Sequence, residues 1–243
     1  MIKVTIFNEY FHEQKNEEVK KAYPAGIHGC LKELFEEEGF VVRVLTQHDE
    51  EGNLKEDVGI TEELLKDTDV LVWWGHLFHR QLSPEVTKLV NKEVNCGMGA
   101  IFLHSAHHAE PFISLMGTPC DLKWREGAKE RLWVIDPTHP IMKGLPEYID
   151  LPDEEMYGER FTVPTPDELL MIGTYATNEV FRSACVWKKT NGKVFYFQPG
   201  HETNPIYYMP EIRSILANAV RYVAPAYRVA KCECEQYFGE AIK

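Results

Sequence analysis

Residues 97–106 read GMGAIFLHSA, an apolar run that begins after two glycines and ends in the polar pair His104-Ser105. A short apolar run without polar alternation is typical of a strand that is covered on both faces of a sheet. The small residues Ser105 and Ala106 follow at once and favour a sharp turn into a helix. We therefore expect a strand–turn–helix unit that exposes one side chain at the edge of a parallel sheet.

Segments of the same character lie on the N-terminal side of this unit. Together with the strand of this unit, the predicted strands are Lys3–Phe7, Phe40–Leu45, Asp69–Trp74 and Ala100–His104. Helical patterns separate them, at Ala25–Glu38, at Thr61–Leu65 and from Ser83 to Asn95. Alternation of strands and helices predicts right-handed crossovers, and therefore an α/β fold with a mostly parallel sheet and helices on both faces.

The middle of the chain, from about residue 119 to about residue 181, is rich in Pro, Gly, Trp and charged residues. Its strand-like pieces are Arg131–Ile135, Phe161–Val163 and Leu169–Tyr175. We interpret this segment as an insertion with added strands within a single domain that spans residues 1–243. An Asn191-Gly192 turn then predicts a hairpin of Ser183–Trp187 with Lys193–Gln198. A helix is expected at Glu211–Val223, followed by a C-terminal arm over residues 224–243.

Composition excludes several classes of function. The formal net charge is -12, and no Lys/Arg cluster offers the basic face that a nucleic-acid-binding protein needs. No apolar run approaches the ~18 residues that span a bilayer. The six cysteines form no C-x-x-C pair, and the N-terminus does not resemble a secretion signal. We expect a cytoplasmic protein with free thiols and a small polar ligand.

The placement of the ten histidines is informative, because eight of them lie at or just beyond the carboxyl end of a predicted strand. These eight are His12, His48, His76, His79, His104, His107, His108 and His201. In open α/β sheets, ligands bind outside the carboxyl ends of the strands. A single histidine in a loop is usually solvated or hydrogen-bonded, and His48 fits that description. His76, His104 and His201 stand out because each follows an apolar strand and adjoins a small residue.

Three kinds of chemistry could use these side chains. Imidazoles of His76, His104 and His201, joined by a carboxylate from Glu9, Glu155 or Glu202, would suit zinc or a similar divalent ion. No fixed motif spacing is present, so these ligands would have to converge from separate loops. No nucleotide cofactor is indicated.

The second chemistry is nucleophilic, with Ser105 as nucleophile and His201 as its base, although the glycines of a G-x-S-x-G elbow are missing. The third is general acid–base work on a carbohydrate by His and Glu side chains. In that case Tyr157 would stack on a sugar face, while Arg125 and Arg182 would bind hydroxyls. The irregular middle segment, including Trp124-Arg125-Glu126, would form a lid over the strand ends.

A family resemblance covers most of the chain, from about residue 4 to about residue 225. The matching segments are Gly97–Ser105, Leu115–Thr118, Leu122–Glu126, His139–Ile141, Glu154–Glu159, Pro166–Leu169, Glu179–Ser183 and Phe195–Glu202, after a start with Asn8-Glu-Tyr10, His12, Tyr23-Pro24, Gly26 and His28. In these segments the chain resembles the ThuA family of trehalose-utilisation proteins. The resemblance implies a flavodoxin-like, class I glutamine amidotransferase-like three-layer fold. It also implies a role in disaccharide catabolism, with trehalose, related disaccharides or their 3-keto derivatives as substrates.

Glutaminase activity is not expected, because the elbow offers His104 or Ser105 where amidotransferases have Cys, and His201-Glu202 is adjacent where they have a His-x-Glu pair. We expect an enzyme with His104 and His201 at its catalytic or metal-binding centre, and His76 as a further metal ligand. The residues expected to bind the sugar are Glu9, His28, Arg125, Glu155, Tyr157, Arg182 and Glu202. A non-enzymatic sugar-binding or regulatory protein and a Ser105-dependent hydrolase remain alternatives. Fold analogy favours a homo-oligomer.

Overall fold

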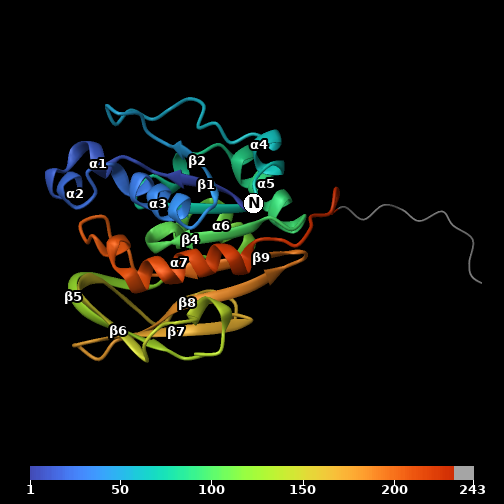
Figure 1. Cartoon of the computed structure of the whole chain (residues 1–243). Helices are drawn as coiled ribbons and strands as arrows, with labels where there is room; N and C mark the ends of the chain where they lie inside the picture. The colour runs from blue at the N-terminus through green and yellow to red at the C-terminus, as the bar shows by residue number, and fades with distance from the viewer. Residues whose placement is uncertain (233–243) are drawn as a thin grey trace, which may run out of the picture.

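The computed structural model describes residues 1–232, and the strands in this range form one nine-stranded sheet in the order β2-β1-β3-β4-β9-β8-β7-β5-β6 (Figure 1). The strands are β1 (Lys3–Asn8), β2 (Val41–Thr46), β3 (Val70–Trp74), β4 (Gly99–Leu103), β5 (Lys123–Val134), β6 (Tyr148–Gly158), β7 (Glu168–Tyr175), β8 (Val180–Lys189) and β9 (Gly192–Phe197). The sheet divides into a parallel half and an antiparallel half.

The parallel half consists of β2, β1, β3, β4 and β9, each paired in parallel with its neighbours within this half. Every residue of β3 and β4 is buried, as expected for strands that are covered on both faces. The four predicted strands of the N-terminal half are confirmed to within about a residue at each end. The hairpin of β8 with β9 is confirmed as well, although β8 is longer than the predicted Ser183–Trp187 at both ends.

The antiparallel half corrects the sequence-based expectation of a mostly parallel sheet. In residues 1–232, β9, β8, β7, β5 and β6 are joined by antiparallel pairings, and these are as numerous as the parallel ones. No α-helix separates consecutive strands in this segment, and antiparallel strands need no helical crossover. Trp124-Arg125-Glu126, expected in an irregular lid, lie in β5, whereas Phe161–Val163 do not form a strand.

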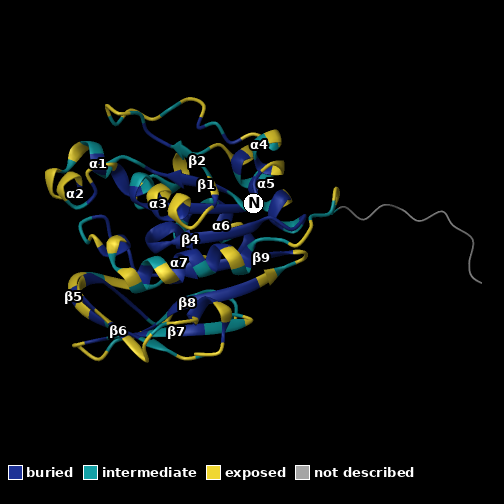
Figure 2. Ribbon diagram, viewed as in Figure 1, coloured by how far each residue is buried: buried dark blue, intermediate teal, exposed yellow. Residues whose placement is uncertain are grey.

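Helices cover both faces of the sheet. They are α1 (His12–Lys15), α2 (Glu17–Ala22), α3 (Gly26–Glu37), α4 (Glu62–Lys66), α5 (Pro84–Asn95), α6 (Glu110–Met116) and α7 (Pro210–Val223), with short 3-10 turns at η1 (His79–Gln81), η2 (His104–His108), η3 (Pro140–Met142) and η4 (Ile206–Tyr208). Apolar side chains of α3 and α7 pack on one face of the sheet, and those of α4, α5 and α6 pack on the other. Figure 2 shows a buried central sheet between helices whose outer surfaces are exposed.

The chain after α7 is described as far as Cys232. Arg228 packs back on the fold, because it donates hydrogen bonds to the carbonyl oxygens of Leu65 and Thr68 and pairs with Glu93. The rest of the expected C-terminal arm, residues 233–243, lies outside the described residues. No helix in residues 1–232 has both the length and the apolar character needed to cross a membrane.

Candidate metal centre

Four elements bring one side chain each to a common point at the edge of the sheet. His76 follows β3, His104 follows β4, and His201 lies a few residues after β9. These three strands are neighbours and run in parallel, so their carboxyl ends meet at one edge. Glu155 comes from β6, which ends the antiparallel half but also contacts β8. The structure therefore brings together the three histidines that the sequence singled out and one of its three candidate carboxylates.

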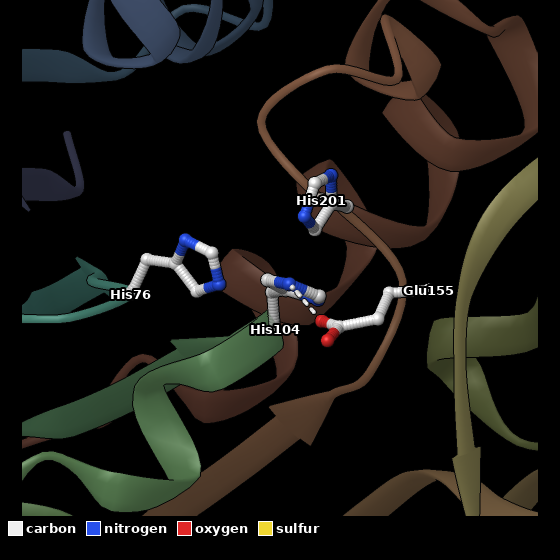
Figure 3. A group of neighbouring side chains, drawn as sticks. All are labelled: His76, His104, Glu155 and His201. Carbon is white, nitrogen blue, oxygen red and sulfur yellow. Dashed lines mark ion pairs between the residues drawn. The ribbon is translucent and has the colours of Figure 1, made fainter. Parts of the chain in front are cut away.

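The geometry of this four-residue group suits a single cation. One ligand atom from each of His76, His104, Glu155 and His201 lies within 4.8 Å of the other three. The centroids of the three imidazole rings are 5.3–5.7 Å apart. Figure 3 shows the rings arranged around one point, with the Glu155 carboxylate facing His104. Three nitrogens and one oxygen form a donor set that zinc and similar ions accept.

Burial leaves ligand atoms of this group without partners. The side chain of His104 is fully buried, and those of Glu155 and His201 are 4% and 7% exposed. His104 Nε2 and Glu155 Oε2 lie 3.1 Å apart, yet neither has a hydrogen-bond partner. A buried polar atom without a partner costs about 1–3 kcal/mol, so the fold holds these atoms at a free-energy cost that a bound cation would remove.

His104 occupies the turn that joins β4 to η2. Its backbone φ is +52°, in the left-handed region that non-glycine residues rarely adopt. The carbonyl oxygen of Gln198 lies 3.1 Å from His104 Nδ1, and the Tyr157 ring stacks on the imidazole with centroids 5.2 Å apart. An Nδ1–H donated to this carbonyl leaves the Nε2 lone pair free for a metal ion. The elbow position, which the sequence left open between His104 and Ser105, is thus that of His104, and its side chain is buried.

The electrostatics of the group favour a bound positive charge. Burial lowers the pKa of His201 to about 4, which keeps this imidazole neutral and able to coordinate at neutral pH. Burial also disfavours the charged form of His104, but the adjacent Glu155 carboxylate outweighs it, so the pKa of His104 is raised. Burial alone would raise the pKa of Glu155, but the contact of this carboxylate with His104 outweighs burial, so the pKa of Glu155 is lowered.

Two buried carboxylates hold the loops that carry His76 and His201. Glu9 accepts hydrogen bonds from the backbone N–H groups of residues 76, 77 and 78, at 2.8–3.1 Å. Glu154 accepts from the N–H groups of Gly200, His201 and Glu155, at 3.0–3.1 Å. Burial raises the pKa of Glu154 to about 7. Glu9, expected to bind sugar or metal, therefore supports the loop of a ligand residue.

The other predicted site residues lie around the centre or away from it. Ser105 Oγ is 2.7 Å from the Tyr157 hydroxyl, and no imidazole within residues 1–232 shares a hydrogen bond with it. His28 lies 3.0 Å from the Asn8 amide, outside the four-residue group, and burial lowers its pKa to about 4. Glu202 lies beside the group, with Oε1 3.1 Å from His76 Nδ1.

The two predicted sugar-binding arginines lie in the antiparallel half and are already paired. Arg182 in β8 bonds the Glu159 carboxylate at 2.8 Å and the carbonyl oxygen of Phe161 at 2.6 Å. Arg125 in β5 lies 3.7 Å from Glu179. The structure does not bring either guanidinium to the histidines.

Two residues near the centre received no role from the sequence. One is His12, whose Nδ1 lies 3.4 Å from Glu202 Oε1. Its position just beyond β1 and its place among the residues of the family resemblance were the signals. The other is Glu154, which the sequence shows only as one of two adjacent glutamates in β6.

A cavity of about 740 Å³ adjoins the centre. His76 lines it together with Phe78, His79, Arg80, His108 and Asp121. Pockets for small molecules commonly measure about 300–1,000 Å³, so this cavity has room for a disaccharide. Its lining mixes rings with charged and hydrogen-bonding groups, as a polyol requires.

Comparison with solved structures places the fold. A ThuA-like protein from Parabacteroides merdae is similar with a TM-score of 0.69 at 16% identity, covering 94% of this chain and 92% of that one. A ThuA-like protein from Bacteroides uniformis gives 0.64 at 18% identity and 91% of each chain. A glutamine amidotransferase from Thermotoga maritima gives 0.50 at 11% identity, covering 90% and 98%. At these identities the likeness shows a shared amidotransferase-like fold.

A search of curated proteins found no match. Comparison with family models is more specific than either the fold or that search. The family model described as "ThuA: Trehalose utilisation" matches residues 3–223, a range that includes β1 to α7 and every residue of the centre. The expectation drawn from the sequence segments is confirmed, and the chain belongs to the ThuA family.

Proposed function

We propose that this chain is an enzyme of disaccharide catabolism that acts on a disaccharide or its 3-keto derivative. His76, His104, Glu155 and His201 would hold a divalent cation, with zinc as the leading candidate. The observation that carries the proposal is the convergence of these four side chains from separate elements, with buried ligand atoms that lack hydrogen-bond partners. A small sugar as ligand, a cytoplasmic location and a homo-oligomeric state remain predictions from the sequence.

The surroundings of the centre suit chemistry at a sugar carbonyl. A bound zinc ion supplies Lewis-acid polarisation of a carbonyl oxygen. The chain itself orients His104 through the Gln198 carbonyl and keeps bulk water away by burying His104 and Glu155. Exclusion of water strengthens electrostatic interactions with a reacting group. The cavity at His76 gives a sugar access to this side of the centre.

The first test is the metal content of the full chain. Elemental analysis of the purified protein is expected to show a stoichiometric transition metal, and His104→Ala should contain less of it. His108→Ala is the matched control, because His108 lies on the same 3-10 turn but is half-exposed and outside the group. A metal content in His104→Ala equal to that of the wild type would refute the proposed ligand set.

The second test is turnover. Trehalose, other disaccharides and their 3-keto derivatives are incubated with the metal-loaded protein, and product is followed by chromatography. Turnover by the wild type is expected, and His104→Ala should reduce it by about 10²–10³-fold, since loss of one group that stabilises the transition state costs this much. Saturable binding of a sugar without any turnover would instead establish a non-enzymatic sugar-binding protein.

A further inference from the structure

A second group of metal-binding side chains shares His76 with the centre. His12, His76 and Glu202 each place a ligand atom within 4.8 Å of the other two. Glu202 Oε1 lies 3.1 Å from His76 Nδ1 and 3.4 Å from His12 Nδ1. Two ligands bound to one tetrahedral ion at about 2.0–2.1 Å are about 3.3 Å apart. The distances from Glu202 to the two imidazoles are therefore close to those between ligands of one small cation.

The atoms of this second group are buried and poorly satisfied. His76 Nδ1 and Glu202 Oε2 are both buried and have no hydrogen-bond partner. The Glu202 side chain as a whole is only 5% exposed. His12 Nε2 is likewise buried without a partner. A carboxylate withdrawn from water in this way requires a positive partner or several donors. The group offers Glu202 only imidazoles, and a cation would satisfy it.

His76 faces both groups. Its Nδ1 lies against Glu202, and Figure 3 shows the other nitrogen of the ring directed toward His104 and His201. Glu202 also reaches both groups, because Oε1 lies near His12 and His76 while Oε2 is 3.6 Å from His201 Nε2. The two groups are thus joined through one imidazole and one carboxylate.

We propose that the chain binds two divalent cations, one in the four-residue group and a second between His12, His76 and Glu202, with the His76 ring bridging them. The proposal rests on the proposed metal centre and adds the second ion. An imidazole that coordinates through both nitrogens has lost its N–H proton, so binding of the second cation releases that proton to solvent. No electron transfer is involved.

The two positions differ in accessibility. Of the ligands that the two groups do not share, His12 is 16% exposed and Glu202 5% in the second group, whereas His104, Glu155 and His201 in the first are exposed by 7% or less. The second group also has three ligands where the first has four. We therefore expect the second cation to bind more weakly and to be the first that a chelator removes.

The test is a titration of the metal-free full chain with Cu²⁺, followed by EPR and elemental analysis. The wild type is expected to bind two equivalents, with an EPR signal smaller than its copper content because bridged Cu²⁺ ions couple magnetically. His12→Ala and Glu202→Gln should each bind one equivalent, with a signal that accounts for all the copper. His79→Ala, which removes a neighbouring histidine outside both groups, should still bind two.

The outcomes separate this proposal from the first. One equivalent in the wild type, unchanged in His12→Ala and Glu202→Gln but lost in His104→Ala, would overturn the second cation and leave the four-residue centre intact. One equivalent that is lost in His12→Ala and kept in His104→Ala would overturn both sites as proposed. Absence of bound metal in the folded wild type would overturn both as well. If His12→Ala does not fold, the near-isosteric Glu202→Gln decides alone.

Discussion

At the scale of single residues, His104 and Ser105 are adjacent in sequence but have different environments. The imidazole of His104 faces the other ligands, while the hydroxyl of Ser105 meets Tyr157. The sequence predicted that one residue of this turn would face the site. It left the choice open because the choice depends on the backbone φ of His104, which no local pattern reveals.

Ser105→Ala tests this assignment. The substitution removes one side chain–side chain hydrogen bond, so we expect the free energy of unfolding to fall by about 1 kcal/mol and turnover to change by less than about tenfold. Urea denaturation and sugar turnover measure the two effects. A loss of turnover by several orders of magnitude, with metal content unchanged, would restore Ser105 as a nucleophile.

Glu130 gives a prediction about pH. This fully buried carboxyl accepts hydrogen bonds from Ser183 and the Gln198 amide, and burial raises its pKa well above the ordinary value of 4.5. The folded state therefore holds its proton more tightly than the unfolded state. The contribution of Glu130 to stability is fully present below pH 4.5 and declines as pH rises toward the raised folded pKa.

Glu130→Gln should remove that decline. Each unit of pKa shift corresponds to about 1.4 kcal/mol. As pH rises from 5 to 8, the free energy of unfolding of the variant should therefore increase relative to that of the wild type by up to about 1.4 kcal/mol per pH unit. Urea denaturation at both pH values measures the gain. Glu17→Gln, at an exposed carboxyl, serves as the control. An equal difference between variant and wild type at both pH values would contradict the prediction.

At the scale of elements, the buried parallel strands were predictable and the antiparallel ones were only partly so. β3 and β4 are continuous apolar runs, so their sequence alone identifies them. β5 is largely exposed or half-buried along its length and is rich in charge, so it lacks that signal and is stabilised by pairing with β6 and β7. The sequence could therefore not choose Glu155 over Glu9 and Glu202, because that choice depends on the path of β6.

The segment between β9 and η4 carries the prediction at this scale. Gly200 has φ +130°, and a Cβ at this position would overlap the Tyr207 hydroxyl. Gly200→Ala should therefore destabilise the fold by more than about 2 kcal/mol and weaken metal binding through His201. Thermal denaturation and metal content measure these effects.

Gly39→Ala is the matched control for that substitution. Gly39 also has a positive φ, +80°, but no atom lies within 4 Å of a Cβ built there. Only backbone strain of about 1–2 kcal/mol is expected, with metal content unchanged. Equal effects of the two substitutions would show that the contact with Tyr207 is unimportant.

At the scale of the whole molecule, metal binding should be visible as stability. A ligand that binds only the folded state stabilises it by about 2.7 kcal/mol at 100 times its dissociation constant. Chelation should therefore lower the melting temperature by several degrees, and added zinc should restore it. His104→Ala should show a smaller response to chelator than the wild type. An unchanged melting temperature in the wild type, with metal removal verified, would argue against binding to the folded state.

The backbone hydrogen bonds accepted by Glu9 and Glu154 have a consequence for kinetics. These carboxylates fix residues 76–78 and 200–201 from within the protein, whether or not an ion is present. Both loops are then ordered when the protein folds, and the conformational entropy is lost at that stage. The ligands therefore need little rearrangement when an ion binds. Amide hydrogen exchange at these positions should stay slow after chelation, and metal uptake should not be limited by rearrangement of these loops.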